Sequence, residues 1–332
     1  MFLPAAHRCF KAALAALCIL APASYAQADE LPTIRVAFNA PGDEAKLLMR
    51  AQPALFPAIG KEYNIQWIQL QGTATVSQAL IAGTADCGIT APLTMAQAIV
   101  RAGLKPVLIG ATIGESPSSF TSYWATTEDS PVRSVADLKG RKISVNTIGS
   151  QVDVMTRVWL KQHGLEPDRD VTIAEVPFPL SEAALRQKRI DAILLVQPFA
   201  AKAEQTGGLR KLGALRDVQP VLINLLEACR ADFVDREPKA VAQYAKDFAA
   251  ASQRFTQDHE ASIALLADTL KIPRPAIESF MFTPRDYQRY PDGAIPLDAV
   301  QRSFDLFFEH GFLKDKLQVS QYVRPGITLA TP

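Results

Sequence analysis

Short apolar runs alternate with stretches of helical periodicity through the first third of the chain. The strand-like runs are residues 34–38, 64–70, 86–89 and 106–110. Apolar side chains recur every three or four positions in the stretches between them, residues 43–56, 76–82 and 93–102. Strands that alternate with helices predict βα units, so we expect an α/β fold with a largely parallel sheet covered on both faces.

A second series of the same kind begins at Arg141. It contains strand-like runs at 141–145, 170–174 and 193–196, with helical patterns at 151–162 and from Ser181 onward. The two series align at a spacing of 105 residues, which places Asp86 and Asp191 in register after a helical stretch and a tight turn. A short carboxylate at a turn usually accepts backbone N–H bonds, so we interpret both aspartates as structural. The repeat predicts two doubly wound α/β lobes.

The last third of the chain returns to one strand and then becomes helical. Residues 221–226 are strand-like, and from Pro238 to about Leu313 the pattern is mostly helical. A helical segment of this length must cover something, most simply the first lobe. The predicted division is therefore 29–122 for the first part of lobe 1, 123–222 for an inserted lobe 2, and 223–332 for the rest of lobe 1. The two crossing strands, near 123–127 and 223–228, would form a hinge.

Residues 1–28 have the pattern of a secretory signal peptide. Arg8 and Lys11 precede an apolar run over 12–23, which is shorter than the roughly 20 residues that span a bilayer. The small residues of Ala26-Gln-Ala28 suit cleavage after Ala28. A lipoprotein anchored at Cys18 is disfavoured because the bulky Leu17 precedes that cysteine. We expect an exported, soluble mature protein.

The charge balance of the mature chain excludes some classes of binding partner, and its cysteine content allows one disulfide. Without residues 1–28 there remain 33 bases against 34 acids, so no broad basic surface is expected for nucleic acid or anionic membranes. Two cysteines remain, Cys87 and Cys229. Export permits a disulfide between them, but a chain this long can bury an ample core without one, and the sequence leaves both possibilities open.

Reactive side chains do not form a catalytic pattern in the mature sequence. His163, His259 and His310 lack the spacing of a zinc site, so neither a metal nor a cofactor is expected. His163 is interpreted as a helix C-terminal residue, Cys87 as a buried strand residue, and Gly207-Gly208 as the end of a helix. Glu115 and Asp153 are two acids at unknown separation, which is weak support for catalysis.

The stretch Asn146 to Asp153 (NTIGSQVD) joins a predicted strand to a predicted helix with small and hydroxyl residues. An unobstructed helix start presents unpaired backbone N–H groups and favours an anion. Ser150 would cap the helix beginning at Gln151, and Gly149 would let a ligand approach the backbone. The alternative is that Gly-Ser only caps the helix.

Five short motifs in this order resemble the periplasmic solute-binding proteins of ATP-driven importers, in the group for nitrate, sulfonates, taurine and related compounds. They are ALIAGTAD at 79–86, SVADLKGRKI at 134–143, TIGS at 147–150, GLEPDRDV at 164–171 and QKRIDA at 187–192. The resemblance covers nearly the whole mature chain. It implies the type II periplasmic-binding fold, with two α/β lobes, two crossing strands and a ligand in the cleft between the lobes.

The family's cleft loops fall at strand ends, where open α/β sheets bind ligands. In lobe 1 the expected ligand-binding residues are Asn39, Pro41, Gly42, Gln71, Gly72, Thr73, Thr90, Ala91, Pro92 and, more weakly, Ser119. In lobe 2 they are Thr147, Gly149, Ser150, Gln151, Pro177, Phe178, Gln197 and Phe199. Backbone amides at the helix starts would hold a small anion of the sulfonate, nitrate or aromatic acid class. No arginine lies in these loops, so no strong charge clamp is expected. Phe178 and Phe199 either stack on a flat ligand or pack under the loops.

The resemblance also implies partners and a location. We expect a periplasmic monomer that delivers its ligand to an ABC permease in the inner membrane. Two alternatives remain open: an enzyme on the same scaffold, as in the related pyrimidine synthases, and a ligand-sensing domain.

Overall fold

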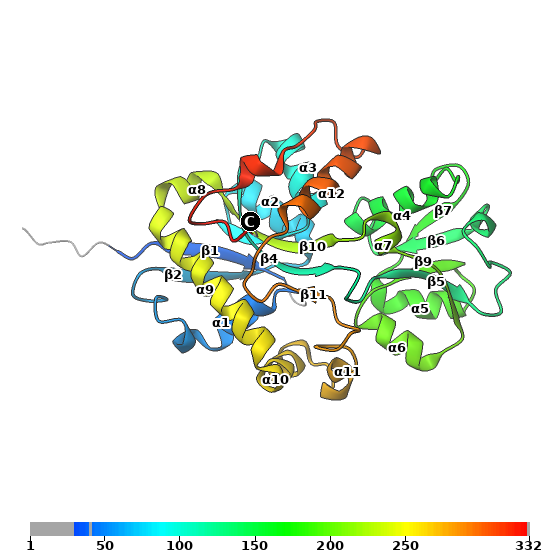
Figure 1. Ribbon diagram of the computed structural model, residues 1–332, viewed down its shortest axis with the longest axis horizontal. Coiled ribbons are helices and arrows are strands. Elements are labelled where there is room, and N and C mark those ends of the chain that lie inside the picture. Colours follow the sequence, from blue (N-terminus) through cyan, green and yellow to red (C-terminus); the bar gives the residue numbers. More distant parts are fainter. Residues whose placement is uncertain (1–29, 40–41, 331–332) are drawn as a thin grey trace, which may run out of the picture. The chain divides into compact units, whose positions relative to one another are not determined.

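Two β-sheets organise the chain in the computed structural model, which describes residues 30–39 and 42–330 (Figure 1). In these residues the first sheet has six strands in the order β11 (Gln288–Arg289), β4 (Pro106–Glu115), β10 (Leu222–Arg230), β3 (Cys87–Thr90), β1 (Thr33–Phe38) and β2 (Asn64–Gln69). β1 pairs in parallel with β2 and β3, whereas β10 is antiparallel to β3 and β4. The second sheet has five strands in the order β7 (Thr172–Glu175), β6 (Lys142–Val145), β8 (Ala192–Leu195), β5 (Tyr123–Thr127) and β9 (Leu209–Ala214). β6 pairs in parallel with β7 and β8.

Helices cover both faces of each sheet, as the alternating pattern predicts. On the first sheet these are α1 (Glu44–Ala51), α2 (Gly72–Ala82), α3 (Pro92–Ala102), α8 (Ala231–Arg236), α9 (Pro238–Gln257), α10 (His259–Leu270), α11 (Arg274–Glu278) and α12 (Leu297–Glu309). On the second sheet they are α4 (Gln151–Gln162), α5 (Phe178–Arg186), α6 (Phe199–Thr206) and α7 (Leu215–Val218). Short 3₁₀ turns occupy Pro53–Leu55, Ala136–Leu138 and Val319–Tyr322. The mixed α/β fold class is confirmed.

The C-terminal helices pack on the first sheet, as predicted. α9 packs against α1 and β4, and α12 packs against α3 and β10. Figure 1 shows α3 and α12 on one face of this sheet and α1 and α9 on the other. Leu93, Phe304 and Phe307 belong to a buried apolar cluster that continues to Trp124 of β5 and Trp159 of α4, whose indole rings stack with centroids 4.0 Å apart.

Asp86 and Asp191 occupy equivalent positions in the two sheets, so their structural interpretation is confirmed. Asp86 accepts a hydrogen bond from the backbone N–H of Arg35, and Asp191 accepts one from that of Lys142, each at 2.9 Å. The backbone N–H of each aspartate donates back to the carbonyl of the same residue, at 2.8 Å in both cases. Each carboxylate thus ties a strand start to the neighbouring parallel strand.

Three segments differ from the sequence expectation. Tyr123–Thr127 is not a crossing but a full strand of the second sheet, paired with β8 and β9, and residues 223–228 lie within β10 of the first sheet. The chain passes between the sheets over residues 116–122 and 219–221. The segment 279–296 is not helical and contributes β11 to the edge of the first sheet. Pro284, Pro291 and Gly293 explain this break, because proline and glycine interrupt helices.

Cys87 and Cys229, whose pairing the sequence did not decide, form a disulfide. Cys87 of β3 and Cys229 of β10 are paired across the antiparallel ladder, 142 residues apart in sequence, and both are fully buried. The interpretation of Cys87 as a buried strand residue holds, but it is not a free thiol.

Candidate functional site

Six strand-to-helix junctions carry almost all of the predicted ligand-binding residues. In the first sheet β1, β2 and β3 lead to α1, α2 and α3, and in the second β6, β7 and β8 lead to α4, α5 and α6. Because the strands of each trio are parallel, their junctions share one edge of the sheet. Ser119 lies instead in the connection 116–122, and Pro41 lies outside the described residues.

Ser150 caps α4 as expected. Its backbone is extended, and its Oγ atom accepts a hydrogen bond from the N–H of Asp153 at 3.3 Å and donates to Oδ1 of Asn146 at 3.0 Å. His163 at the other end of α4 is the C-terminal cap, and its Nδ1 lies 2.8 Å from the carbonyl oxygen of Trp159. Both predicted ends of this helix, Gln151 and Gln162, are confirmed.

Two carboxylates already occupy part of this helix start. The N–H of Gly149 donates to Oδ2 of Asp153 at 2.8 Å, and that of Ile148 donates to Oε2 of Glu175 at 2.8 Å. The side chain of Arg157 is 2.7 Å from Oδ1 of Asp153, so the charge of this carboxylate is balanced. The amides of Gln151 and Val152 have no partner within the described chain, and they are the donors left for a ligand.

The junctions after β1 and β2 are joined through Asn39. Its Oδ1 atom accepts the N–H of Gly72 at 3.3 Å, and its own N–H donates to Oδ2 of Asp43 at 3.2 Å. The amide of Gly72 is therefore used within the chain, while Gln71 and Gly72 remain exposed. Gly72 has a φ of +76°, and a side chain built there would meet no atom within 4 Å.

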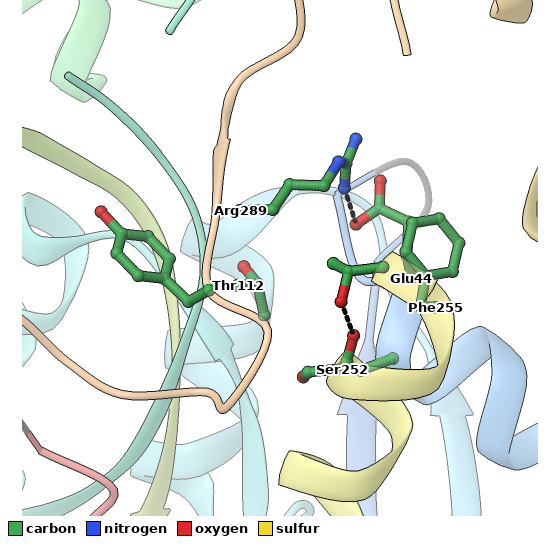
Figure 2. Close-up of a pocket in the computed structure, with 8 residues that line it drawn as sticks. Glu44, Thr112, Ser252, Phe255 and Arg289 are labelled. Carbon is green, nitrogen blue, oxygen red and sulfur yellow. Dashed lines mark hydrogen bonds and ion pairs between the residues drawn. The ribbon is translucent and has the colours of Figure 1, made fainter. Parts of the chain in front are cut away.

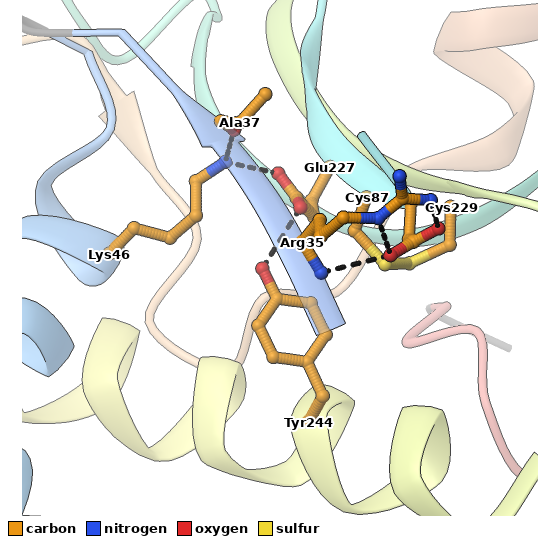
Figure 3. Close-up of a disulfide and its surroundings, with 8 residues drawn as sticks. Arg35, Ala37, Lys46, Cys87, Glu227, Cys229 and Tyr244 are labelled. Atoms are coloured by element: carbon orange, nitrogen blue, oxygen red, sulfur yellow. Dashed lines mark hydrogen bonds and ion pairs between the residues drawn. A yellow bond between two sulfur atoms is a disulfide. The ribbon is translucent and has the colours of Figure 1, made fainter. Parts of the chain in front are cut away.

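Asp43 belongs to a buried charge cluster with Lys46 and Glu227. Figure 3 shows Lys46 bonded to Ala37 and Glu227, and Tyr244 bonded to Glu227. The Nζ atom of Lys46 lies 2.9 Å from Asp43 and 2.6 Å from Glu227, and it also donates to the carbonyl of Ala37. Tyr244 donates to Glu227 at 2.9 Å. The side chains of Lys46, Asp43 and Glu227 are all inaccessible to solvent. Asn39 is thus fixed through Asp43 to strand β10.

The cluster carries two acids for one lysine, which sets its protonation. Burial raises the pKa of Asp43 to about 7, although the ammonium of Lys46 opposes the shift. Burial likewise raises the pKa of Glu227. Burial disfavours the charged form of Lys46, but the two carboxylates outweigh it and raise its pKa. A proton on Asp43 would leave the cluster neutral.

Gln151 joins the junctions of the two sheets. Its Oε1 atom accepts the N–H of Leu93 at 3.4 Å, and its Nε2 atom donates to the carbonyl of Ile223 at 3.2 Å. Leu93 follows Ala91 and Pro92 at the start of α3, and all three are buried. Thr90 is also buried, and its hydroxyl bonds to those of Ser77 and Thr94. The start of α3 is therefore closed by protein contacts.

Gln197 makes a second link between the sheets. Its Nε2 atom donates to the carbonyl of Arg285 at 2.9 Å, its Oε1 accepts the N–H of Ala201, and its backbone N–H donates to the hydroxyl of Tyr287 at 3.1 Å. Phe178 and Phe199, near the starts of α5 and α6, stack on each other with centroids 6.3 Å apart. Pro177 and Thr147 are exposed.

A cavity of about 150 Å³ brings Gly42 of the first sheet together with Gln197 of the second. Its wall also includes Glu44, Pro198, Tyr287, Arg289 and the apolar residues Ile113, Leu225, Leu266, Leu270, Ile272, Ile277, Phe280 and Met281. Arg289 is 2.7 Å from Asp286 and 3.6 Å from Glu44, and it lies over the rings of Phe255 and Phe282.

A second cavity lies beside the ion pair of Arg289 and Glu44 and is lined also by Thr112 and Ser252 (Figure 2). It measures only about 20 Å³ and admits a single water molecule at most.

Ser119 lies in the connection 116–122, and Glu115 is the last residue of β4, directly before it. Ser119 accepts the N–H of Ser116 at 2.8 Å. The buried Glu115 accepts hydrogen bonds from Thr121, from the backbone and hydroxyl of Ser122, and from Asn224 of β10. Burial raises the pKa of Glu115 despite these donors. This acid therefore links the connection 116–122 to β10.

The sequence expectation missed Arg289 and the apolar cavity wall. Arg289 lies in β11, and most of the apolar wall comes from α10 and residues 272–281, with Ile113 from β4 and Leu225 from β10. The pattern from Pro238 to about Leu313 predicted mostly helix for the part of this region that forms β11. The two arginines and two prolines of residues 284–291 were the sequence features that could have indicated a non-helical segment with charged side chains. Among the described residues no helix is long and apolar enough to cross a membrane, and no group of three His, Cys, Asp or Glu side chains is placed to hold a metal ion.

Two mixed α/β sheets, each with strand-to-helix junctions at the ends of its parallel strands, form the fold of the type II periplasmic binding proteins. The structure of the periplasmic aliphatic sulphonate binding protein SsuA from Escherichia coli matches with a TM-score of 0.72 at 23% identity, over 90% of this chain and 99% of that chain. The nitrate-binding protein NrtA from Synechocystis matches with a TM-score of 0.66 at 16% identity, over 89% and 86%.

Sequence comparison gives the family. The sequence model of the NMT1-like family matches residues 27–270, and the chain belongs to this family. An Escherichia coli protein named for binding aliphatic sulfonates is 28% identical over 269 residues, which cover 79% of this chain and 80% of that protein. The resemblance inferred from the five motifs is confirmed.

Proposed function

We propose that this protein is the solute-binding component of an ATP-driven importer and that it binds a small organic anion between its two sheets. The observation that carries this proposal is the meeting of strand-to-helix junctions from both sheets at Gln151 and at the cavity shared by Gly42 and Gln197. Family membership and the names of the sulfonate-binding and nitrate-binding relatives support the same reading.

Helix starts supply the attraction for an anion. The unpartnered amides at the start of α4 belong to Gln151 and Val152, and Thr73 offers another at the start of α2. Each helix start contributes roughly 0.3 to 1 kcal/mol to an exposed anion, and up to about 2 kcal/mol when partly buried. Two helix starts together give moderate attraction, so apolar contacts must add to the affinity.

Lobe closure is the second element of the proposal. The chain passes between the sheets twice, at residues 116–122 and 219–221, which is the arrangement of a hinge. Gln151 and Gln197 hold the sheets together on either side of the junctions. A ligand that contacts both sheets favours the closed form by its difference in affinity for the two forms. The proposed division into lobes at residues 123 and 222 follows these connections.

The place of action follows from the same proposal. Removal of residues 1–28 would release the mature chain into the periplasm as a monomer, and its ligand-bound form would dock on an inner-membrane permease. The signal region lies outside the described residues. Cell fractionation of a Gram-negative host that expresses the full-length chain tests this part: a processed protein in the periplasmic fraction supports export, and an unprocessed cytoplasmic protein contradicts it.

A thermal-shift screen of the mature protein tests the proposed binding. The panel contains sulfonates, nitrate, aromatic acids, thiamine precursors and neutral amides. A ligand at a hundredfold excess over its Kd stabilises the fold by about 2.7 kcal/mol. Mass spectrometry of the recovered ligand then separates the alternatives, because an intact ligand supports a binding protein and a transformed ligand supports an enzyme. If no anion in the panel raises the melting temperature, the anion-binding proposal is contradicted.

A further inference from the structure

The cavity beside Gln197 has the composition of a site for an apolar group. Eight of its wall residues are aliphatic, aromatic or methionine side chains, supplied by β4, β10 and the segment from α10 to residue 281. Leu266, Ile277, Phe280 and Met281 are buried. An engineered cavity of about 150 Å³ lined by Leu, Ile and Phe binds benzene, and this cavity has a similar volume and lining.

The polar groups on the same wall are paired with one another. Both ends of the Gln197 amide are hydrogen-bonded, and the hydroxyl of Tyr287 accepts the backbone N–H of Gln197. Arg289 is held by Asp286 and Glu44. Two carboxylates face this single guanidinium, so the wall offers no surplus positive charge to an anion. An uncharged body suits the cavity better than a charged one.

The cavity includes residues of two strand-to-helix junctions, Gly42 after β1 and Gln197 and Pro198 after β8. Gly42 lies three residues after Asn39, whose side chain bonds to Gly72 at the start of α2. Gly42 has a φ of +102°, and a Cβ atom there would stand 2.6 Å from Cδ1 of Leu225 in the cavity wall. Glycine at position 42 therefore leaves room for the side chain of Leu225 in the cavity wall. Pro198, which also lines the cavity, directly precedes α6.

We infer that this cavity receives the apolar body of the ligand, of the size of a six-membered ring, while its anionic head lies at the helix starts outside. The inference rests on the proposed function and makes its ligand class narrower: an amphiphilic organic anion such as an aryl or branched alkyl sulfonate or carboxylate. Discrimination between anions with the same head then comes from the region of α10 and α11, and not from the Phe178–Phe199 stack.

Isothermal titration of the mature protein with methanesulfonate, hexanesulfonate and benzenesulfonate tests the inference. We expect benzenesulfonate to bind at least tenfold more tightly than methanesulfonate. Leu270→Phe, which fills the cavity from α10, should weaken benzenesulfonate binding at least tenfold and leave methanesulfonate unchanged. The control Leu265→Phe makes the same substitution on the same helix at a half-buried position outside the cavity wall, and should change neither. Ile272→Phe is a second filling variant, to be used if Leu270→Phe does not fold.

Benzene alone separates this inference from the proposed function. If benzene raises the melting temperature of the wild type but not of the filling variant, while no sulfonate binds, the cavity assignment stands and the anion proposal fails. If all three sulfonates bind alike in every variant and benzene has no effect, the cavity inference is overturned and the anion proposal survives.

Discussion

Gln151 of α4 donates a hydrogen bond from its Nε2 atom to the carbonyl oxygen of Ile223 in β10, at 3.2 Å. The same side chain accepts the N–H of Leu93. One glutamine at a helix start in the second sheet is thereby fixed to two elements of the first. In the proposed function this residue stabilises the arrangement in which both sheets contact the ligand.

Gln151→Ala should loosen that arrangement. Two hydrogen bonds contribute about 0.5 to 1.5 kcal/mol each, so we expect the Kd for the ligand to rise roughly fivefold or more. Small-angle X-ray scattering of the unliganded variant should give a larger radius of gyration. Gln162→Ala is the matched control, because Gln162 is exposed at the other end of α4. Unchanged scattering and affinity in Gln151→Ala would show that the bridge does not stabilise closure.

The buried cluster below Asn39 predicts a pH dependence of stability. The pKa of Asp43 is about 7 in the fold against 3.8 for an ordinary aspartate, so between these values the folded protein keeps a proton that the unfolded chain has released. Stability contributed by this group is therefore greatest below pH 4 and is lost as the pH rises towards 7. The raised pKa of Glu227 acts in the same direction.

Asp43→Asn removes the titrating group but keeps an acceptor for Lys46 and Asn39. The wild type should lose free energy of unfolding as the pH rises from 5 to 8, and the variant should not. The difference in free energy of unfolding, variant minus wild type, should therefore increase by about 2 kcal/mol over this range. Urea unfolding at both pH values measures this gain. Asp315→Asn changes an exposed acid and should give no such gain. A parallel pH response of wild type and Asp43→Asn would mean that Asp43 does not carry the buried proton.

The disulfide between Cys87 and Cys229 should make a large contribution to stability. Its loop spans 142 residues, for which the chain-entropy relation gives about 5 kcal/mol. The double variant Cys87→Ala/Cys229→Ala should unfold at a lower urea concentration than the oxidised wild type. Added reductant should lower the midpoint of the wild type after full reduction and leave the variant unchanged. Free thiols in the unfolded, unreduced wild type would contradict the bridge.

The sheets could be predicted from sequence because apolar periodicity follows directly from which faces are buried. The pattern predicted the observed ends of α4, Gln151 and Gln162, and it predicted Ser150 as the N-terminal cap of this helix. Asp86 and Asp191 were interpretable because a turn carboxylate acts through local backbone groups. These features depend on residues close in sequence or on a repeated unit.

The cavity and the disulfide could not be predicted because they depend on which distant segments become neighbours. Cys229 faces Cys87 only because β10 returns to the first sheet and lies antiparallel to β3. Arg289 lies 3.6 Å from Glu44, although the two residues are more than two hundred positions apart in sequence. The sequence pattern predicted mostly helix in this region, so it did not indicate the strand that places Arg289 there. Gly72 was expected to donate its amide to a ligand and Gly149 to let a ligand approach the backbone, but the amides of both residues bond to side chains, those of Asn39 and Asp153.

Titration of the best-binding anion against Ser150→Asn and Ser150→Asp tests the central claim, anion binding at the helix starts, most directly. Asn and Asp are both good helix caps of nearly equal shape, so the pair isolates charge at the start of α4. We predict that Ser150→Asn binds like the wild type, and that Ser150→Asp loses at least tenfold in affinity with a melting temperature within a few degrees of the wild type. Equal anion affinity in Ser150→Asp and Ser150→Asn would show that the anion is not held at this helix start.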